Sequence, residues 1–160
     1  MKKTIFIGLD SGKHGGMAVF YPDGKRLTYK YAKELSFNLI LREIANIALI
    51  EGYNIFAMLE ALSGFQGENR FQMRGSQTLK MGETYGKIQG WLEAYDIPFR
   101  TVVPRTWQKN LPQISSIHEY GAKKRALNLL AKQRFPELKP TLETCDAILI
   151  ADYAKSIYKG

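Results

Sequence analysis

Short apolar runs separated by turn-forming residues dominate the first sixty positions of the chain. Residues 4–9 form a largely apolar run, which predicts a buried strand, and residues 15–21 after a glycine-rich turn predict its hairpin partner. The turn signal Pro22-Asp23-Gly24 leads to a third predicted strand over residues 25–31. Residues 55–59 are apolar at every position, which is typical of a strand buried on both faces.

Helical spacing of apolar residues follows in longer segments. The predicted helices cover residues 36–52, 76–95, 122–134 and 141–158, with Ser36 and Thr141 as N-caps and Gly52 closing the first. A fifth strand is predicted over residues 99–103, whereas residues 63–74 and 105–120 show no period and are predicted to be irregular. Strands in hairpins followed by alternating helices and strands predict an α/β fold, in which helices flank a mixed β-sheet.

The length and composition are those of a single globular domain over residues 1–160. Hydrophobic residues make up 45% of the chain, and no apolar stretch approaches the 18 residues of a transmembrane helix, so no membrane association is expected. The first apolar run is too short for a signal peptide, because it meets Asp10. The single cysteine, Cys145, excludes an internal disulfide and is typical of a reducing compartment, so we expect a cytoplasmic protein.

Positive charge is concentrated in one part of the chain. The formal net charge is +8, and residues 100–139 contain nine Lys and Arg against two acids, Glu119 and Glu137. A basic segment of this kind either forms a solvated surface or binds a polyanion such as nucleic acid. Charge alone leaves both interpretations open.

Four acidic residues stand next to apolar segments, although they lie far apart in sequence. Asp10 and Glu60 each end an apolar run, and Glu143 and Asp146 lie three apart before the apolar residues 147–151. A carboxylate beside a core segment is unfavourable unless it is paired or bound to a cation. If the two strands are parallel, Asp10 and Glu60 meet at one sheet edge, and Glu143 and Asp146 share a helix face. The four acids therefore predict a site for hard divalent cations such as Mg²⁺.

Two divalent ions about 3.5–4 Å apart can activate a water and stabilise the leaving oxygen in phosphoryl displacement. An acidic site in a basic chain thus predicts metal-dependent chemistry on a phosphate polyanion. Three of the acids also have an ordinary structural interpretation: Asp10 as a turn residue, Glu60 as a solvated strand end, and Glu143 as a partner of the helix dipole. Asp146 is harder to explain in this way, because it precedes an apolar helix. The four together favour the metal site. Asp152 lies about 120° around the helix from Asp146 and is left out.

These residues, in this order, resemble the RuvC-type Holliday-junction resolvases, which have a ribonuclease-H-like fold. The matching segments are Ile7-Gly8-Leu9-Asp10-Ser11-Gly12, Leu59-Glu60, Leu79-Lys80-Met81-Gly82, Val103-Pro104-x-x-Trp107, Lys123-Lys124 and Glu143-x-x-Asp146-Ala147. Each motif is common by itself, but their order, spacing and total length are specific together. The likeness spans nearly the whole chain, and the compact length is typical of a phage-encoded member.

The resemblance implies a homodimeric endonuclease that nicks two opposing strands of a four-way DNA junction, in a bacterial cell or a phage-infected host. It implies two Mg²⁺ ions, replaceable by Mn²⁺, and no small-molecule cofactor. The implied ligands and catalytic acids are Asp10, Glu60, Glu143 and Asp146, and the implied catalytic cations are Lys123 and Lys124. These lysines would offset charge on the phosphate. The third acid of the family is often Asp, so Glu143 is one methylene longer.

The expected DNA contacts come from basic and aromatic residues around the acids. They are Phe65, Arg70, Phe71, Arg74, Lys80, Arg105, Trp107, Lys109, Lys123, Lys124 and Arg125. Bacterial members of the family place an aromatic residue into the junction soon after the second acid, and Phe65 or Phe71 would take that place. Trp107 could stack on DNA, but a Trp that follows a strand is also a common core residue.

Gly82, Gly86 and Gly90 recur on one face of the long predicted helix. Each lowers helix stability by about 1 kcal/mol relative to Ala, so a structural reason is expected. The glycines allow either a close helix–helix contact between two subunits or tight packing on the protein's own sheet.

Other functions remain in competition. A nuclease of the same fold could act on flaps, forks or RNA–DNA hybrids, and a catalytically inactive protein could bind branched DNA without metal. The glycine-rich residues 8–16 are also similar to the phosphate loop of sugar kinases and actin-like ATPases, which need two such domains. Metal dependence separates the nuclease from the inactive binding protein.

Overall fold

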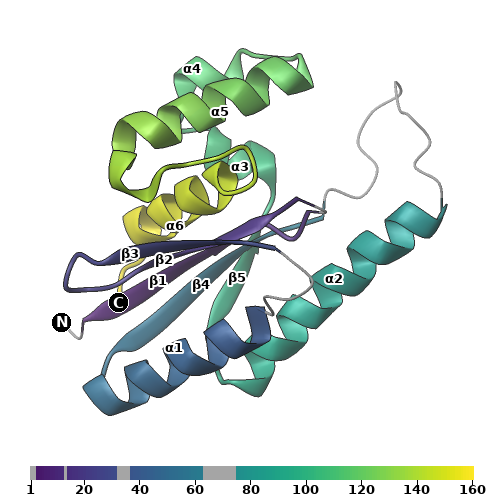
Figure 1. The fold of residues 1–160 in the computed structure, drawn as a ribbon. Coiled ribbons are helices and arrows are strands. Elements are labelled where there is room, and N and C mark those ends of the chain that lie inside the picture. Colours follow the sequence, from purple (N-terminus) through teal and green to yellow (C-terminus); the bar gives the residue numbers. More distant parts are fainter. Residues whose placement is uncertain (1–2, 13, 32–36, 63–74) are drawn as a thin grey trace.

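The computed structural model describes residues 3–12, 14–31, 37–62 and 75–160. Its single sheet contains β1 (Thr4–Leu9), β2 (Gly16–Phe20), β3 (Arg26–Lys30), β4 (Asn54–Glu60) and β5 (Phe99–Val102). The strand order is β3-β2-β1-β4-β5 (Figure 1). The pairs β1–β2 and β2–β3 are antiparallel, while β4 runs parallel to both β1 and β5. The predicted mixed sheet is confirmed, and the predicted strand limits differ by one residue at most.

Helices cover both faces of the sheet (Figure 1). The helices are α1 (Phe37–Glu51), α2 (Gly75–Ala94), α3 (Pro104–Gln108), α4 (Pro112–Ser115), α5 (Tyr120–Arg134) and α6 (Cys145–Ile157), with a 3₁₀ turn over Pro136–Leu138. The first two lie on one face, and α3 to α6 form a layer over the other. Within the described ranges, no helix has the length and hydrophobicity needed to cross a bilayer.

Successive side chains of β1 and β4 point alternately toward the helices on the two faces of the sheet. Ile7, Leu9 and Leu59 are fully buried in the core that β1 and β4 share with α1 and α2. Because successive side chains point to opposite faces of a sheet, the even-numbered positions of both strands face the layer of α6. Met58 belongs to that second core. Asp10 and Glu60 continue the even-numbered series on the same face.

Helix α6 lies directly against the sheet because two glycines leave room for its backbone. A side chain at Gly8 would overlap the carbonyl oxygen of Ala147 and the backbone nitrogen of Ala151. A Cβ at Gly16 would come within 2.8 Å of the carbonyl oxygen of Glu143. The close approach places the first turn of α6 over the ends of β1 and β2.

The segment 105–120, predicted to be irregular, instead contains most of α3 and all of α4. Trp107 of α3, Ile114 of α4 and Leu111 between them are buried at 2%, 1% and 6% exposure and belong to the same core cluster. Each short helix begins at a proline, which suits the first helical position because its missing N–H would have no partner there. The prediction was wrong because these single-turn helices are stabilised by burial rather than by local propensity.

The last helix begins later than predicted. Residues 141–144 form a turn in which the backbone N–H of Thr141 donates to Thr144 Oγ1 at 3.0 Å and the N–H of Thr144 donates to the carbonyl of Thr141 at 3.2 Å. Helix α6 therefore starts at Cys145, and Thr141 is not its N-cap. Glu143 lies in the turn before the helix, so it does not share a helix face with Asp146.

The other predicted helix limits have mixed outcomes. Gly52 has φ +67° and ends α1 as predicted, whereas the predicted cap Ser36 lies outside the described residues. Helix α5 begins at Tyr120, two residues earlier than predicted, because the Glu119 carboxylate accepts hydrogen bonds from the N–H groups of Gly121 and Ala122.

Candidate active site

The ends of two parallel strands bring Asp10 and Glu60 together. Leu9 of β1 is paired with Leu59 of β4, so the residues that follow are neighbours at the same edge of the sheet. Asp10 is held in a tight turn: its Oδ1 accepts a hydrogen bond from the N–H of Gly12 at 2.9 Å, and its own N–H donates to the carbonyl of Gly16 at 2.9 Å. The turn thereby fixes the carboxylate of Asp10.

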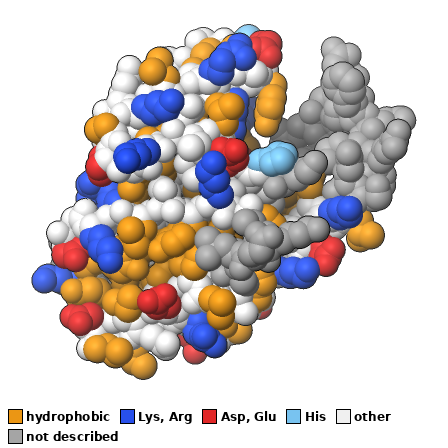
Figure 2. All heavy atoms as spheres, viewed as in Figure 1, with side chains coloured by type: hydrophobic (Ala, Val, Ile, Leu, Met, Phe, Trp, Pro, Cys, Tyr) orange, Lys and Arg blue, Asp and Glu red, His pale blue; other side chains and the backbone are white. Residues whose placement is uncertain are grey.

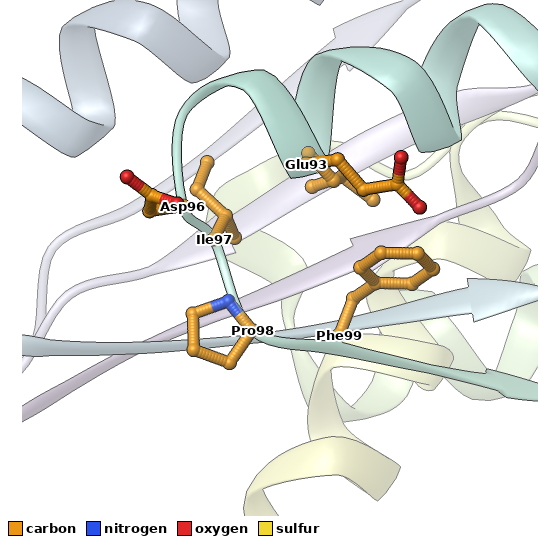
Figure 3. Close-up of a pocket in the computed structure, with 6 residues that line it drawn as sticks. Glu93, Asp96, Ile97, Pro98 and Phe99 are labelled. Atoms are coloured by element: carbon orange, nitrogen blue, oxygen red, sulfur yellow. The ribbon is translucent and has the colours of Figure 1, made fainter.

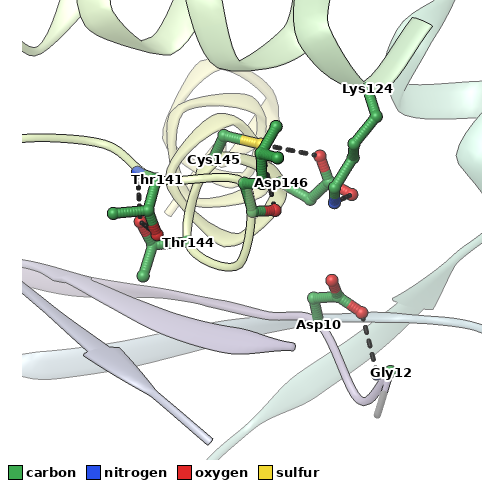
Figure 4. Close-up of polar contacts among 8 residues, drawn as sticks. Asp10, Gly12, Lys124, Thr141, Thr144, Cys145 and Asp146 are labelled. Carbon is green, nitrogen blue, oxygen red and sulfur yellow. Dashed lines mark hydrogen bonds and ion pairs between the residues drawn. The ribbon is translucent and has the colours of Figure 1, made fainter. Parts of the chain in front are cut away.

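The layer above the sheet contributes Asp146 and Lys124 (Figure 4). Asp146 lies in the first turn of α6, and its Oδ2 is 2.5 Å from Nζ of Lys124 on α5. Both side chains are largely buried, at 12% and 20% exposure. Cys145 Sγ is 3.4 Å from the other carboxylate oxygen of Asp146 and donates a weak hydrogen bond to it. In Figure 4, Asp10 at the end of β1 lies below the end of α6 that carries Asp146.

The carboxylates disturb one another because they are buried side by side. Burial, followed by the charges of Asp10 and Asp146, raises the pKa of Glu60 to about 9, against an opposing effect of Lys124. Burial and Asp146 likewise raise the pKa of Asp10, although the N–H of Gly12 and Lys124 oppose this. Burial lowers the pKa of Lys124, but the charge of Asp146 and its hydrogen bond outweigh burial and raise it overall. Burial and mutual repulsion thus favour the protonated forms of Glu60 and Asp10 in the metal-free site.

The donor set fits a hard divalent cation. Glu60 Oε2 is buried and has no hydrogen-bond partner among the described residues, which is unfavourable unless a cation or water satisfies it. Carboxylate oxygens from Asp10, Glu60 and Asp146 are the ligands that Mg²⁺ and Mn²⁺ prefer. In the described part of the chain, no three Asp, Glu, His or Cys side chains already stand in coordinating positions. Side-chain adjustment would therefore accompany metal binding.

Glu143 is not brought together with the other three acids. Its Oε2 is 3.5 Å from Nζ of Lys30, at the end of β3. A hydrogen bond from the Thr141 side chain, its own backbone N–H and the nearby Lys30 hold the pKa of Glu143 below its usual value. The side chain is 38% exposed. The structure thus joins three of the four predicted acids and places the fourth on the rim.

The predicted basic contacts are distributed over several elements. Arg105 and Lys109 are exposed, at and just beyond α3, and Lys123 is partly exposed on α5. Arg125 is exposed and lies 3.7 Å from Glu119. Figure 2 shows Lys and Arg side chains spread over the layer that α5 helps to form. Lys80 is separate from these, because it is exposed on α2 below the sheet.

The aromatic candidates divide into one core residue and two that lie outside the described part of the chain. Trp107 is 2% exposed and packs with Phe56 and Val102, so we leave it out of the proposed DNA surface. Four of the predicted contacts lie outside the described residues: Phe65, Arg70, Phe71 and Arg74.

Some residues around the site were missed by the sequence-based predictions. Lys30 as the partner of Glu143 had no local signal, because the two residues are remote in sequence and meet only when the turn before α6 packs on the end of β3. Gly8 and Gly16 did carry a signal: a glycine in or beside an apolar strand often marks a close backbone approach. The glycines could have located the helix that crosses the site.

A shallow depression elsewhere on the surface is not part of the acidic site. Its lining includes Glu93, Asp96, Ile97, Pro98 and Phe99, where α2 turns into β5 (Figure 3). Phe99 begins β5, whereas Glu60 is paired with Val102 near the other end of that strand. The depression therefore lies at the opposite edge of the sheet from the carboxylates.

No protein-family model and no curated protein sequence matches this chain. Solved structures do match: RuvC from Thermus thermophilus aligns over 93% of this chain and 92% of its own, with a TM-score of 0.55 and 15% identity. T. thermophilus RuvC in complex with a Holliday junction substrate aligns over 93% and 91%, with a TM-score of 0.52 and 13% identity. Together with the sheet order, this likeness shows a ribonuclease-H-like α/β fold.

Proposed function

We propose that this protein is a metal-dependent endonuclease that resolves four-way DNA junctions by paired nicks. Two observations carry the proposal. Asp10, Glu60 and Asp146 lie close enough for their charges to affect one another. One oxygen of Glu60 is also buried without a hydrogen-bond partner among the described residues. Three acids crowded in a largely buried site are unfavourable for folding alone, so a role in binding a cation accounts for them. The similar fold of a RuvC that was solved with a Holliday junction supports the choice of substrate.

Within this proposal, Asp10, Glu60 and Asp146 hold two Mg²⁺ ions, and Mn²⁺ substitutes for them. When bound, the ions would activate a water and stabilise the leaving oxygen of a phosphodiester. Glu143 is the fourth proposed ligand, and its side chain has to leave Lys30 to take that role. The turn at Gly12 orients Asp10, and Lys123 and Lys124 supply positive charge for the phosphate.

The proposed DNA surface includes basic residues of α3, α5 and α2. It consists of Lys80, Arg105, Lys109, Lys123, Lys124 and Arg125, together with Phe65, Arg70, Phe71 and Arg74 from the segment outside the described residues. Phosphate contacts of this kind make affinity fall steeply with salt and depend little on sequence. One of the two phenylalanines would then enter the junction.

A homodimer is part of the proposal, and the glycine stripe of α2 supports it. Among the described residues, a Cβ at Gly82, Gly86 or Gly90 would meet no atom within 4 Å, so packing on the protein's own sheet does not explain these residues. The buried side of α2 carries Ile88 and Leu92 instead. The open stripe is suited to close approach of a second copy, and two-fold symmetry of the protein would match that of the junction.

Gly86→Leu tests the dimer. A Cβ at this position meets no atom of the described residues within 4 Å, and leucine favours the helix more than glycine does, so the melting temperature should not fall. A second helix packed against the glycines would be displaced by the larger side chain. We expect sedimentation equilibrium to show a dimer for the wild type and at least about a tenfold weaker dimer for the variant. Lys87→Leu, about 100° around the helix, is the matched control. A wild-type monomer, or equal weakening by both variants, would contradict the proposed seam.

The proposed function is tested by incubating the purified protein with a labelled immobile four-way junction and with a linear duplex of the same sequence. We expect paired, symmetric nicks in the junction only, in Mg²⁺ and not in EDTA, with binding retained in EDTA. Flap and fork substrates are assayed in the same way, and preferential cleavage of these would mean that they, rather than the four-way junction, are the substrate. Binding without cleavage in any divalent metal would indicate an inactive DNA-binding protein, and no binding would remove the DNA function.

A further inference from the structure

We propose that the ammonium group of Lys124 takes the place of a cation in the metal-free site and is displaced when a divalent ion binds. The inference rests on the proposed metal-dependent function, and it concerns how occupancy of the same site is controlled. In this view, the contact between Lys124 and Asp146 belongs to the metal-free state.

The contacts of Lys124 are those of a buried counter-ion. Its Nζ lies 2.5 Å from Asp146 Oδ2, and only 20% of its side chain is exposed. Its charge also opposes the mutual repulsion that acts on Asp10 and Glu60. A single ammonium therefore partly balances three carboxylates that come from three different elements.

A metal ion and this ammonium would compete for the same oxygen. Oδ2 of Asp146 is in contact with Lys124, and two positive charges at contact distance from one carboxylate repel each other strongly in a partly buried site. The oxygen of Glu60 that lacks a partner among the described residues remains available to a cation. Metal binding would therefore form a new contact with Glu60, but it would have to break the contact between Lys124 and Asp146.

Displacement needs a movement of the side chain only. Helix α5 is anchored by Leu127, Leu130 and Ala131, which are buried in the core shared with α6. Lys124 has a flexible four-carbon stem, so its ammonium can leave Asp146 while the helix stays in place. The released charge would then be available to a DNA phosphate, which links phosphate binding to metal occupancy.

Calorimetric titration of the full-length, metal-free protein with Mn²⁺ and Mg²⁺ tests the displacement, together with thermal melting in EDTA. The variants are Lys124→Met, which removes the charge, Lys124→Arg, which keeps it, and Lys123→Met as the matched control on the same helix. We expect Lys124→Met to melt at a lower temperature than the wild type in EDTA and to bind Mn²⁺ at least about tenfold more tightly, since no cation has to be displaced. The metal affinities of Lys124→Arg and Lys123→Met should stay within about threefold of the wild type.

Each outcome of this titration decides the proposal. Tighter metal binding by Lys124→Met alone, or a Lys124→Met protein that folds only when Mn²⁺ is added, supports it. If the wild type binds metal and Lys124→Met binds with the same or lower affinity, the displacement is overturned while the proposed nuclease stands. If neither the wild type nor any variant binds a divalent ion, both the displacement and the proposed metal-dependent function fail.

Discussion

Asp146→Asn is expected to lower junction cleavage on the order of 10²- to 10³-fold while junction binding stays the same or becomes tighter. Asn has nearly the same volume as Asp and can still accept a hydrogen bond from Lys124, so the packing of α6 on the sheet should persist. The substitution removes one of the four negative charges that would hold the metal. It also removes repulsion between the site and the DNA phosphates, which is why binding is not expected to weaken.

Asp152→Asn is the matched control for this prediction. Asp152 lies on the same helix, and its carboxylate pairs with Arg134 at 2.9 Å, away from the other acids. Cleavage rates under single-turnover conditions and junction affinity in EDTA should be measured for both variants, together with their melting temperatures. Loss of binding and a lower melting temperature in Asp146→Asn would mean that the residue has a structural role instead.

The second large effect concerns Glu60 and the pH dependence of stability. The pKa of Glu60 is raised to about 9 in the folded protein, from a usual value of 4.5. Between these values the folded state holds a proton that the unfolded state has released, so the stabilising contribution is complete below about pH 4.5 and is lost as the pH rises toward about 9. We therefore expect the metal-free wild type to lose on the order of 3 kcal/mol of unfolding free energy between about pH 5 and about pH 8.

Glu60→Gln should remove most of this loss, because the amide carries no proton that titrates in that range. Urea unfolding in EDTA at several pH values measures the slope, and the advantage of Glu60→Gln over the wild type should grow as the pH rises. The ionisation of Asp10 should leave the variant with a slope of the same sign, since the pKa of Asp10 is also raised. Glu51→Gln, at an exposed position on α1, is the control. Equal slopes for the wild type and Glu60→Gln would contradict the buried, crowded state of this carboxylate.

Addition of Mg²⁺ should oppose the same loss. A cation between the carboxylates stabilises their ionised forms, so the gain in stability from metal should be larger at about pH 8 than at about pH 5. In Glu60→Gln this difference should shrink.

Most of the fold follows from local patterns that the sequence displays. The five strands were predicted because apolar runs of the right length are bounded by turn residues, and Gly52 was predicted to end α1 because a glycine accepts the left-handed conformation it has there. The acids at Asp10 and Glu60 were located by the same means, since each directly follows or ends an apolar strand. These signals involve neighbours in the chain, so they need no knowledge of the tertiary structure.

The parts that were predicted wrongly depend on contacts between distant residues. The helical turn around Trp107 is too short to be stable by itself, and it exists because its indole is buried against other elements. The start of α6 depends on hydrogen bonds within the turn at Thr141, where a threonine cap at the helix start was the simpler expectation. Local helix propensity was close to neutral in both places, so tertiary contacts determined where the helices form and where they begin.

The sequence by itself determined the order of the five strands and the four long helices along the chain, the alternation of side chains along the strands, and the presence of acids at the ends of these elements. Only the tertiary structure decided that Asp146 reaches the two strand-end acids, because that contact depends on α6 lying against Gly8. It also decided that Lys124 pairs with Asp146 and that Glu143 pairs with Lys30. A buried charge pairs with the opposite charge that lies nearest to it in the packed structure. The strength of such a pair depends on distance and burial, which the spacing of residues in the sequence does not reveal.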